Sequence, residues 1–222
     1  MVPVQAVLFD YGMVLSGPPD PAAWARIRTI TRLEEEPLQR EYWAHRHDYD
    51  RGTLTGDAFW RKAAAGADIV LTPEQVADLL DADTDLWGQI NRPMLDWAQR
   101  LQRAGVRTGI LSNIGDAMTD GLLRKHAWLN SFDHRTWSYA LKLAKPEPAI
   151  YRAAAEGLAT PAGNILFIDD RPENVAAAEA AGMQALQYED HPGFERTMHE
   201  RGLDDLLHIG DKAAASRTTL NK

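Results

Sequence analysis

Residues 6–15, AVLFDYGMVL, begin with a short apolar run that ends in Asp10. A second apolar run far downstream, in residues 165–170 (ILFIDD), ends in two carboxylates, Asp169 and Asp170. Short apolar runs that end in polar residues predict buried strands. The carboxyl ends of parallel strands meet at one edge of a sheet, where open α/β folds place their ligands. The two stretches therefore predict a parallel sheet with an acidic site at its carboxyl edge.

Two further polar motifs lie between these stretches. Ser112-Asn113 ends a third strand pattern at residues 107–111, and Lys145 precedes Pro146 in residues 145–148, KPEP. Ser112 and Asn113 stand where a strand gives way to a helix, so hydroxyl, amide and backbone N–H groups can bind phosphate there. We expect both motifs at the same edge of the sheet as the carboxylates.

The order of the remaining patterns predicts an α/β fold, with a Rossmann-like parallel sheet sandwiched by helices. From residue 92 onward, helical patterns (93–104, 115–125, 148–156 and 172–181) alternate with strand patterns (107–111, 135–139, 164–168 and 183–187). Residues 17–90 contain only helical patterns, at 21–31, 38–49, 57–65 and 73–87. We therefore expect a core of residues 1–16 and 91–210, a small helical cap at 17–90 inserted after the first strand, and a flexible tail at 211–222.

Composition narrows the classes of function. A chain of 222 residues with 45% hydrophobic and 25% charged residues can bury one core and a small accessory domain. The formal net charge of -8 argues against a nucleic-acid partner, and the lack of cysteine excludes disulfides and a thiolate nucleophile. No apolar run reaches the roughly 18 residues needed to span a bilayer, and no leader pattern is present. We expect a cytoplasmic protein without a membrane partner; nothing in the sequence indicates the oligomeric state.

The predicted site combines three carboxylates with one cation. Asp10, Asp169 and Asp170 would repel one another by several kcal/mol at close range, and Lys145 offers one positive charge against them. A hard divalent cation would resolve this conflict, and Mg²⁺ suits a site of few carboxylates, water and a substrate phosphate. Metal and lysine together would keep one carboxylate ionised and nucleophilic toward an anionic substrate.

The four motifs in this order and spacing resemble those of the haloacid dehalogenase-like hydrolase superfamily. In that family an Asp motif, a Ser/Thr-Asn motif, a Lys-Pro motif and an acidic pair follow one another, and residues 169–174 with 180–183 are typical of its last motif. The resemblance implies a Mg²⁺-dependent phosphoric monoester hydrolase that acts on a small phosphorylated metabolite through an aspartyl-phosphate.

The same resemblance implies roles for individual residues. Asp10 would be the nucleophile and a metal ligand, together with the Gly12 carbonyl and Asp170. Asp169 would be a ligand through water or a supporting acid. Ser112 and Asn113 would bind the phosphate group, and Lys145 would balance the charge of nucleophile and phosphate.

Gly12 departs from the phosphatase pattern, which has a second Asp there as general acid and base. The Asp-x-Gly-x-Val variant is similar to sugar-phosphate phosphatases of the superfamily, so a sugar phosphate is one candidate substrate. A 2-haloacid dehalogenase that uses Asp10 as its nucleophile stays open as an alternative, as does a weakly active member that binds a phosphorylated metabolite or a partner protein.

Residues 45–52, HRHDYDRG, are the candidate substrate contacts of the cap, with His45 and Arg51 as the expected binding residues. Four tryptophans fall on helical patterns with apolar neighbours, and we expect them to pack in the core or at the cap hinge: Trp43, Trp60, Trp87 and Trp97.

Overall fold

The computed structural model describes residues 3–209, so the tail predicted at 211–222 lies outside the described residues. Five strands form one sheet in the order β3-β2-β1-β4-β5, and every neighbouring pair is parallel. The strands are β1 (Ala6–Phe9), β2 (Arg107–Ser112), β3 (His134–Trp137), β4 (Ile165–Asp169) and β5 (Gln184–Gln187). The predicted parallel sheet is confirmed, with β1 at its centre.

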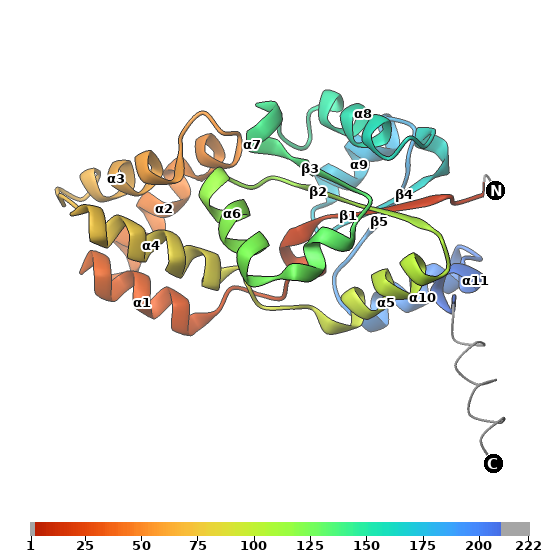
Figure 1. Ribbon diagram of the computed structural model, residues 1–222, viewed down its shortest axis with the longest axis horizontal. Helices are drawn as coiled ribbons and strands as arrows, with labels where there is room; N and C mark the ends of the chain where they lie inside the picture. Colours follow the sequence, from red (N-terminus) through yellow and green to blue (C-terminus); the bar gives the residue numbers. More distant parts are fainter. Residues whose placement is uncertain (1–2, 210–222) are drawn as a thin grey trace, which may run out of the picture.

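Helices cover both faces of this sheet (Figure 1). One face packs against α8 (Pro148–Gly157) and α9 (Pro172–Ala180), and the other against α5 (Arg92–Arg103), α10 (His191–Glu200) and α11 (Asp204–Leu207). Residues of β1 alternate between the two layers, because successive strand side chains point to opposite faces. Leu8 belongs to the cluster of Ile150 on α8, while the ring of Phe9 lies 5.6 Å from that of Trp97 on α5. This is the expected three-layer α/β arrangement.

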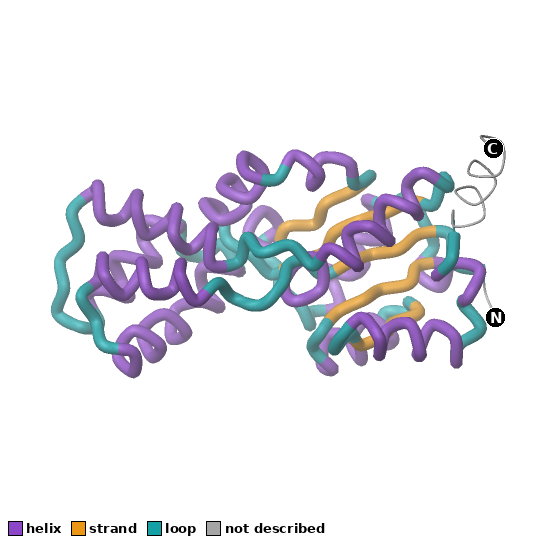
Figure 2. Tube along the Cα trace, turned by 90° about the horizontal axis from the view of Figure 1, so that it is seen from below, coloured by secondary structure: helices purple, strands orange, loops and turns teal. Residues whose placement is uncertain are grey.

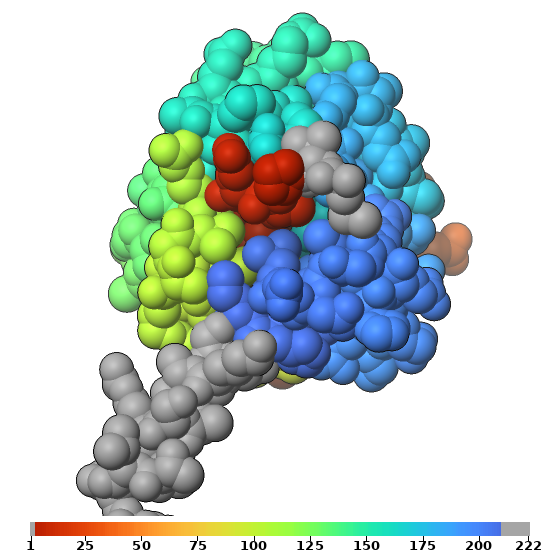
Figure 3. Space-filling view, turned by 90° about the vertical axis from the view of Figure 1, so that its right-hand side faces the viewer, coloured from red at the N-terminus to blue at the C-terminus, as the bar shows by residue number. Residues whose placement is uncertain are grey.

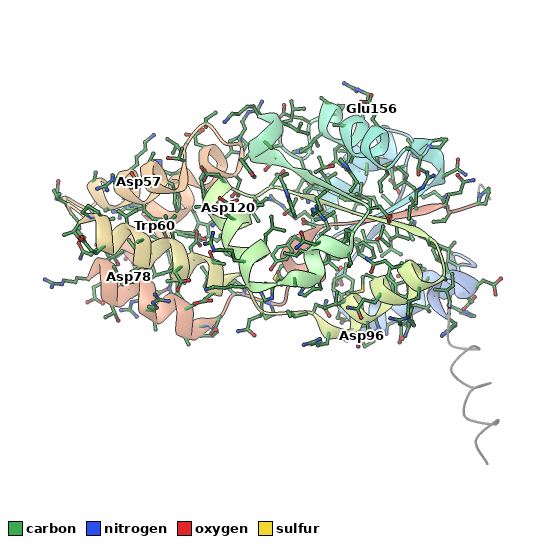
Figure 4. All side chains as sticks on the ribbon, viewed as in Figure 1. Asp57, Trp60, Asp78, Asp96, Asp120 and Glu156 are labelled. Carbon is green, nitrogen blue, oxygen red and sulfur yellow. The ribbon has the colours of Figure 1, made fainter. Side chains whose placement is uncertain are left out.

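Four helices follow β1 before the chain enters α5, and we refer to them as the insert. They are α1 (Pro21–Thr31), α2 (Glu35–Asp50), α3 (Gly56–Ala65) and α4 (Pro73–Leu86). They pack on one another along the long axis of the molecule, beyond one end of the sheet (Figure 2). Trp60 is buried inside the insert, while Asp57 and Asp78 lie on its outside (Figure 4).

The insert meets the core through two antiparallel chain segments. Ser16 and Ile90 form a bridge, and the N–H of Gly17 donates to the carbonyl of Gln89 at 2.8 Å. Because β1 runs toward the insert, the carboxyl edge of the sheet faces it (Figure 1). The first described residues of the chain lie at the opposite end of the molecule (Figure 3).

The remaining helices occupy positions that the sequence patterns did not all predict. Helix α6 (Asp116–Lys125) follows β2, as expected, and packs against α3 and α4 of the insert. Several elements were missed: α7 (Ser138–Leu141), α10, α11 and the wide turn Tyr11–Leu15. Elements of a single turn show too little periodicity to be recognised. Helix α10, at ten residues, is longer and was missed although Asp190 and Pro192 form a good start for it. Among the described residues, no helix has the length and apolar character that a membrane crossing requires.

Candidate active site

The carboxyl edge of the sheet brings the predicted motifs together in one pocket of about 430 Å³. Asp10 follows β1, Ser112 ends β2, and Asp169 and Asp170 stand at the end of β4. Lys145 reaches the same place from the loop between α7 and α8. The pocket is lined by Asp10, Gly12, Ser112, Asn113, Lys145 and Asp170 on the sheet side, with Arg171 and Asn174 beside them.

Lys145 is the centre of a buried ion cluster. Its Nζ lies 2.8 Å from Oδ1 of Asp10 and 2.6 Å from Oδ2 of Asp169. The other oxygen of Asp169 accepts hydrogen bonds from the backbone N–H of Arg171 and from Nδ2 of Asn174, both at 2.9 Å. Both Asp169 oxygens are therefore engaged within the protein, whereas Asp10 and Asp170 face the pocket.

The charges of this cluster do not balance. Asp10, Asp169 and Asp170 can place one oxygen each within 4.8 Å of one another, against the single ammonium of Lys145. Burial raises the pKa of Asp10 to about 7, with Asp169 and Asp170 adding to the rise and Lys145 opposing it. Burial and the Asp169 charge raise the pKa of Asp170 as well. Burial opposes the charge of Lys145, but its two carboxylate partners outweigh this and raise its pKa. An oxygen-only donor set with surplus negative charge fits a hard cation such as Mg²⁺.

Asn113 holds the backbone of Lys145. Its Nδ2 donates to the Lys145 carbonyl at 2.9 Å, and its Oδ1 accepts from the Lys145 N–H at 2.8 Å. These two bonds join the end of β2 to residues 142–147, which we call the lysine loop. Asn113 also lines the pocket, and its contact with phosphate stays a prediction. Ser112 is buried at the pocket wall, where the chain turns toward the start of α6.

Gly12 leaves open space beside Asp10. Its backbone has φ -62° and ψ 132°, an extended conformation that any residue can adopt, and a Cβ built there would meet no atom within 4 Å. A side chain at this position would therefore fit. Because glycine has no side chain, this position offers no proton donor, whereas the phosphatase pattern described above has an Asp here.

The insert side of the pocket is formed by a different set of residues from the one predicted. Trp43, Arg46, His47 and Asp50 line it, whereas His45 and Arg51 do not. The four lining residues recur at helical spacing on α2, so they share one face, and His45 is rotated away from it. Arg51 instead binds Glu147 of the lysine loop, with its Nη2 3.1 Å from Oε2. His45 and Arg51, which the sequence predicts to bind substrate, therefore lie outside the lining of this pocket.

Arg46 lies in the segment 45–52 that the sequence predicts to contact substrate, but it was not singled out there. It is buried, and its Nε donates to Asp50 Oδ1 at 2.9 Å. Its Nη1 approaches Asp83 Oδ1 at 3.4 Å and donates to the hydroxyl of Tyr42, which itself donates to Asp83 at 2.7 Å. Burial raises the pKa of Asp50 to about 6, although Arg46 opposes the rise. The spacing of residues 43, 46, 47 and 50 was the available signal for this face.

The tryptophans divide into two pairs. Trp60 and Trp97 are buried in the interior, as predicted. Trp43 and Trp87 line the pocket, with ring centroids 6.4 Å apart in an edge-to-face arrangement. Trp87 also packs against the main hydrophobic cluster, as expected, so its place at the pocket adds to its predicted packing role.

Three known proteins are similar in sequence to most of this chain. A phosphatase of Mycobacterium tuberculosis is 29% identical over 95% of this chain and 98% of its own length. A sesquiterpene phosphatase of Aspergillus oryzae is 26% identical over 84% of this chain and 90% of its own length. A drimenol cyclase of Aspergillus calidoustus is 26% identical over 97% of this chain, which spans only 41% of that longer protein.

Solved structures share the fold. A haloacid dehalogenase-like family enzyme of Bacteroides thetaiotaomicron, in complex with magnesium and inorganic phosphate, superposes with a TM-score of 0.69. It is 22% identical, and the match covers 86% of this chain and 98% of that one. The family model for haloacid dehalogenase-like hydrolases matches residues 6–182, which include all four motifs at the sheet edge. This chain belongs to the haloacid dehalogenase-like hydrolases.

Proposed function

We propose that this protein is a Mg²⁺-dependent phosphoric monoester hydrolase that acts on a small phosphorylated metabolite. The observation that carries the proposal is the buried cluster in which Lys145 binds Asp10 and Asp169 while Asp170 adds a third carboxylate. Two full-length relatives that carry phosphatase names support the same reaction class.

Asp10 is the nucleophile of this reaction. Its oxygen attacks phosphorus, and the bond from phosphorus to the leaving alcohol breaks. Lys145, 2.8 Å away, opposes the effect of burial on the pKa of Asp10 and so favours its ionised form, and it stabilises the charge that develops on the phosphoryl group. Ser112 and the backbone at the start of α6 hold the phosphoryl oxygens. Water then attacks the phosphorus of the aspartyl-phosphate, which releases phosphate and restores the carboxylate.

The residues that would hold Mg²⁺ are Asp10, Asp170 and the carbonyl of Gly12. The ion would supply charge neutralisation between the carboxylates and the phosphate, and would polarise the phosphoryl oxygens. Asp169 supports the site as a carboxylate rather than as a ligand of the ion, because its oxygens already accept hydrogen bonds from Lys145, Arg171 and Asn174. It orients Lys145 and fixes the start of α9.

We assign residues 17–90 to a cap that determines which organic group enters the site. The insert supplies Trp43, Arg46, His47 and Asp50 to the pocket wall opposite the carboxylates. With glycine at position 12, the proton for the leaving alcohol comes from water, from the substrate or from a cap residue. His47 is the cap residue placed for this role, because it is exposed and lines the pocket.

The dehalogenase alternative is not favoured. It would use the same Asp10 but would leave the surplus negative charge of Asp169 and Asp170 without a function. A catalytically weak binding protein would retain the phosphate site yet release no phosphate.

One experiment separates the three alternatives. Purified protein is assayed for phosphate release from p-nitrophenyl phosphate with Mg²⁺ and with a chelator, and for chloride release from 2-chloropropionate. The proposal requires phosphate release that depends on Mg²⁺. Chloride release without metal would establish the dehalogenase function. If neither phosphate nor chloride is released, the remaining alternative is a protein that binds a phosphorylated metabolite without hydrolysing it.

A further inference from the structure

We propose that the insert side of the pocket is an apolar subsite, so that the substrate is the phosphate ester of an apolar alcohol rather than a sugar phosphate. The inference rests on the proposed function for the phosphate end of the pocket. It concerns the organic group that the phosphate carries.

The first observation is the apolar lining. Met13, Trp43, Trp87, Ile114 and Met118 all face the pocket. Within residues 3–209, four large apolar side chains stay exposed, and two of them are Met13 at 38% and Trp43 at 53%. Exposed apolar side chains gathered in a concave site mark a binding surface.

The second observation is that the polar atoms of the aromatic lining residues are already bonded inside the protein. The Tyr11 hydroxyl donates to the Trp87 carbonyl at 3.0 Å. The indole N–H of Trp87 donates to the Tyr42 hydroxyl at 3.0 Å, and that of Trp43 donates to Gln39 at 3.1 Å. The aromatic rings therefore present apolar surface to the pocket rather than free donors.

Arg46 offers equally little to a polar ligand. Its guanidinium donates to Asp50, Asp83 and Tyr42, and its Nη2 lies 3.3 Å from the sulfur of Met118. Of its two carboxylate partners only Asp50 also lines the pocket, and its charge pairs with that of Arg46, so Arg46 offers little attraction to a second phosphate or carboxylate of a substrate.

Hydroxyl groups of a sugar would have few partners in this part of the pocket. Helix α2 contributes four residues to the lining of the pocket, and Trp87 adds a fifth. Of these five residues, only His47 and Asp50 keep polar atoms free for a ligand. Burying hydroxyl groups without hydrogen bonds costs free energy, whereas burying methylene groups releases it.

The backbone at Met13 points to the same role. Met13 has a φ of 58°, in the left-handed region, where a residue with a Cβ is strained by roughly 1–2 kcal/mol. Its N–H donates to the Ser16 hydroxyl at 3.2 Å, which helps to hold this conformation. In this conformation Met13 lines the pocket, which places its side chain on the wall of the subsite.

Calorimetry with phosphonates tests the subsite without relying on turnover. Ethyl-, butyl-, hexyl- and octylphosphonate are titrated into the Mg²⁺-loaded full-length protein, together with the phosphonate analogue of glucose 6-phosphate. We expect the dissociation constant to fall by about three- to fourfold for each methylene group that enters the subsite. A dissociation constant independent of chain length, no binding of hexylphosphonate, or tighter binding of the glucose analogue would overturn the inference.

Two variants locate the effect. Trp43→Ala should weaken binding more with each added methylene, because it removes an exposed wall of the subsite. Val70→Ala is the matched control, since Val70 is 93% exposed on the insert but lies outside the pocket. Equal chain-length dependence in both variants would contradict the assignment of Trp43.

The same protein sample separates this inference from the proposed function. If the phosphonates bind with the expected chain-length dependence but p-nitrophenyl phosphate is not hydrolysed, the proposed reaction fails and the subsite stands. If p-nitrophenyl phosphate is hydrolysed but affinity is independent of chain length, the reaction stands and the subsite fails.

Discussion

Two buried cations line the pocket, one at the sheet edge and one in the insert, and each binds two carboxylates. Lys145 at the sheet edge contacts Asp10 and Asp169, and Arg46 in the insert contacts Asp50 and Asp83. In the insert cluster, the Tyr42 hydroxyl bonds to both Arg46 and Asp83, and the cluster joins α2 to α4. The sheet-edge cluster differs because a further carboxylate, Asp170, adjoins it.

This difference separates a structural ion cluster from a reactive one. Both clusters are buried, and burial raises the pKa of a carboxylate in each. Only the sheet edge has three carboxylates against one cation, so only there would a bound metal ion relieve repulsion. Burial and an ion pair are therefore insufficient to identify a reactive site, whereas surplus charge facing a pocket is informative.

The largest expected effect comes from the sheet-edge cluster. Asp10→Asn should lower the rate of p-nitrophenyl phosphate hydrolysis by at least about 10⁴-fold, because an amide cannot form the covalent intermediate. Asp96→Asn, on the outer surface of α5 (Figure 4), is the matched control and should retain wild-type turnover. Turnover of the Asp10 variant within tenfold of wild type would show that Asp10 is not the nucleophile.

The second effect concerns the open space at Gly12. Without an acid at that position, aryl phosphates should be hydrolysed about 10²–10⁴-fold faster than alkyl phosphates, since a good leaving group needs no proton. Gly12→Asp should narrow this gap and Gly12→Ala should not. If His47 supplies the proton, His47→Ala should widen the gap, and His45→Ala should leave it unchanged. Equal rates for aryl and alkyl phosphates in all variants would show that another acid operates.

The third effect compares the two cations directly. Lys145→Met and Arg46→Met should each lower the free energy of unfolding by about 3–5 kcal/mol, because each leaves two carboxylates of its cluster without their cation. The loss is measured by urea denaturation against wild type at the same Mg²⁺ concentration. Mg²⁺ should make this loss smaller for Lys145→Met and leave it unchanged for Arg46→Met, whose metal site is intact. Lys142→Met, a change at an exposed position of the lysine loop, should have a much smaller effect. Equal recovery by Mg²⁺ in both cation variants would erase the distinction between the clusters.

The smallest effect is the pH dependence of metal binding. The pKa of Asp10 is raised from 3.8 to about 7, so the folded state retains a proton that the unfolded state has lost. Stability from Asp10 is therefore present below the lower value and is lost as the pH rises toward the upper one. Mg²⁺ competes with that proton, so its effect on the melting temperature should grow from about pH 5 to about pH 8.

Asp170 provides the control for this measurement. Asp170→Ala should abolish the Mg²⁺-dependent rise in melting temperature, while Asp120→Ala on the exposed face of α6 should preserve it. A rise of equal size at both pH values, or one that survives in the Asp170 variant, would place the metal elsewhere.

The sheet-edge half of the site could be predicted from the sequence. Each of its residues follows an apolar strand pattern or stands in a short motif, and parallel strands bring their carboxyl ends together whatever the loops do. Asp10, Ser112, Lys145 and Asp170 all line the pocket for this reason. Asn113 also lies there, but only the structure shows that its side chain is bound to the lysine loop.

The insert half could not be predicted in the same way. The helices α1–α4 were recognised from their periodicity, but which face of α2 reaches the pocket depends on how the insert packs against α6. A rotation of 100° per residue separates Arg46 from His45, so a prediction of the right segment still selected side chains outside the lining of the pocket. The left-handed backbone of Met13 had no local signal, because no glycine or asparagine marks that position.

The central claim is that Asp10 forms a covalent bond to the phosphoryl group, and trapping that intermediate tests it most directly. The Mg²⁺-loaded protein is quenched during turnover of p-nitrophenyl phosphate and treated with borohydride, which reduces an acyl phosphate to an alcohol. Mass spectrometry of the peptide that contains Asp10 should then show the reduced side chain, only when Mg²⁺ and substrate are both present. Full turnover with an unmodified Asp10, or with the modification on another carboxylate, would contradict the account.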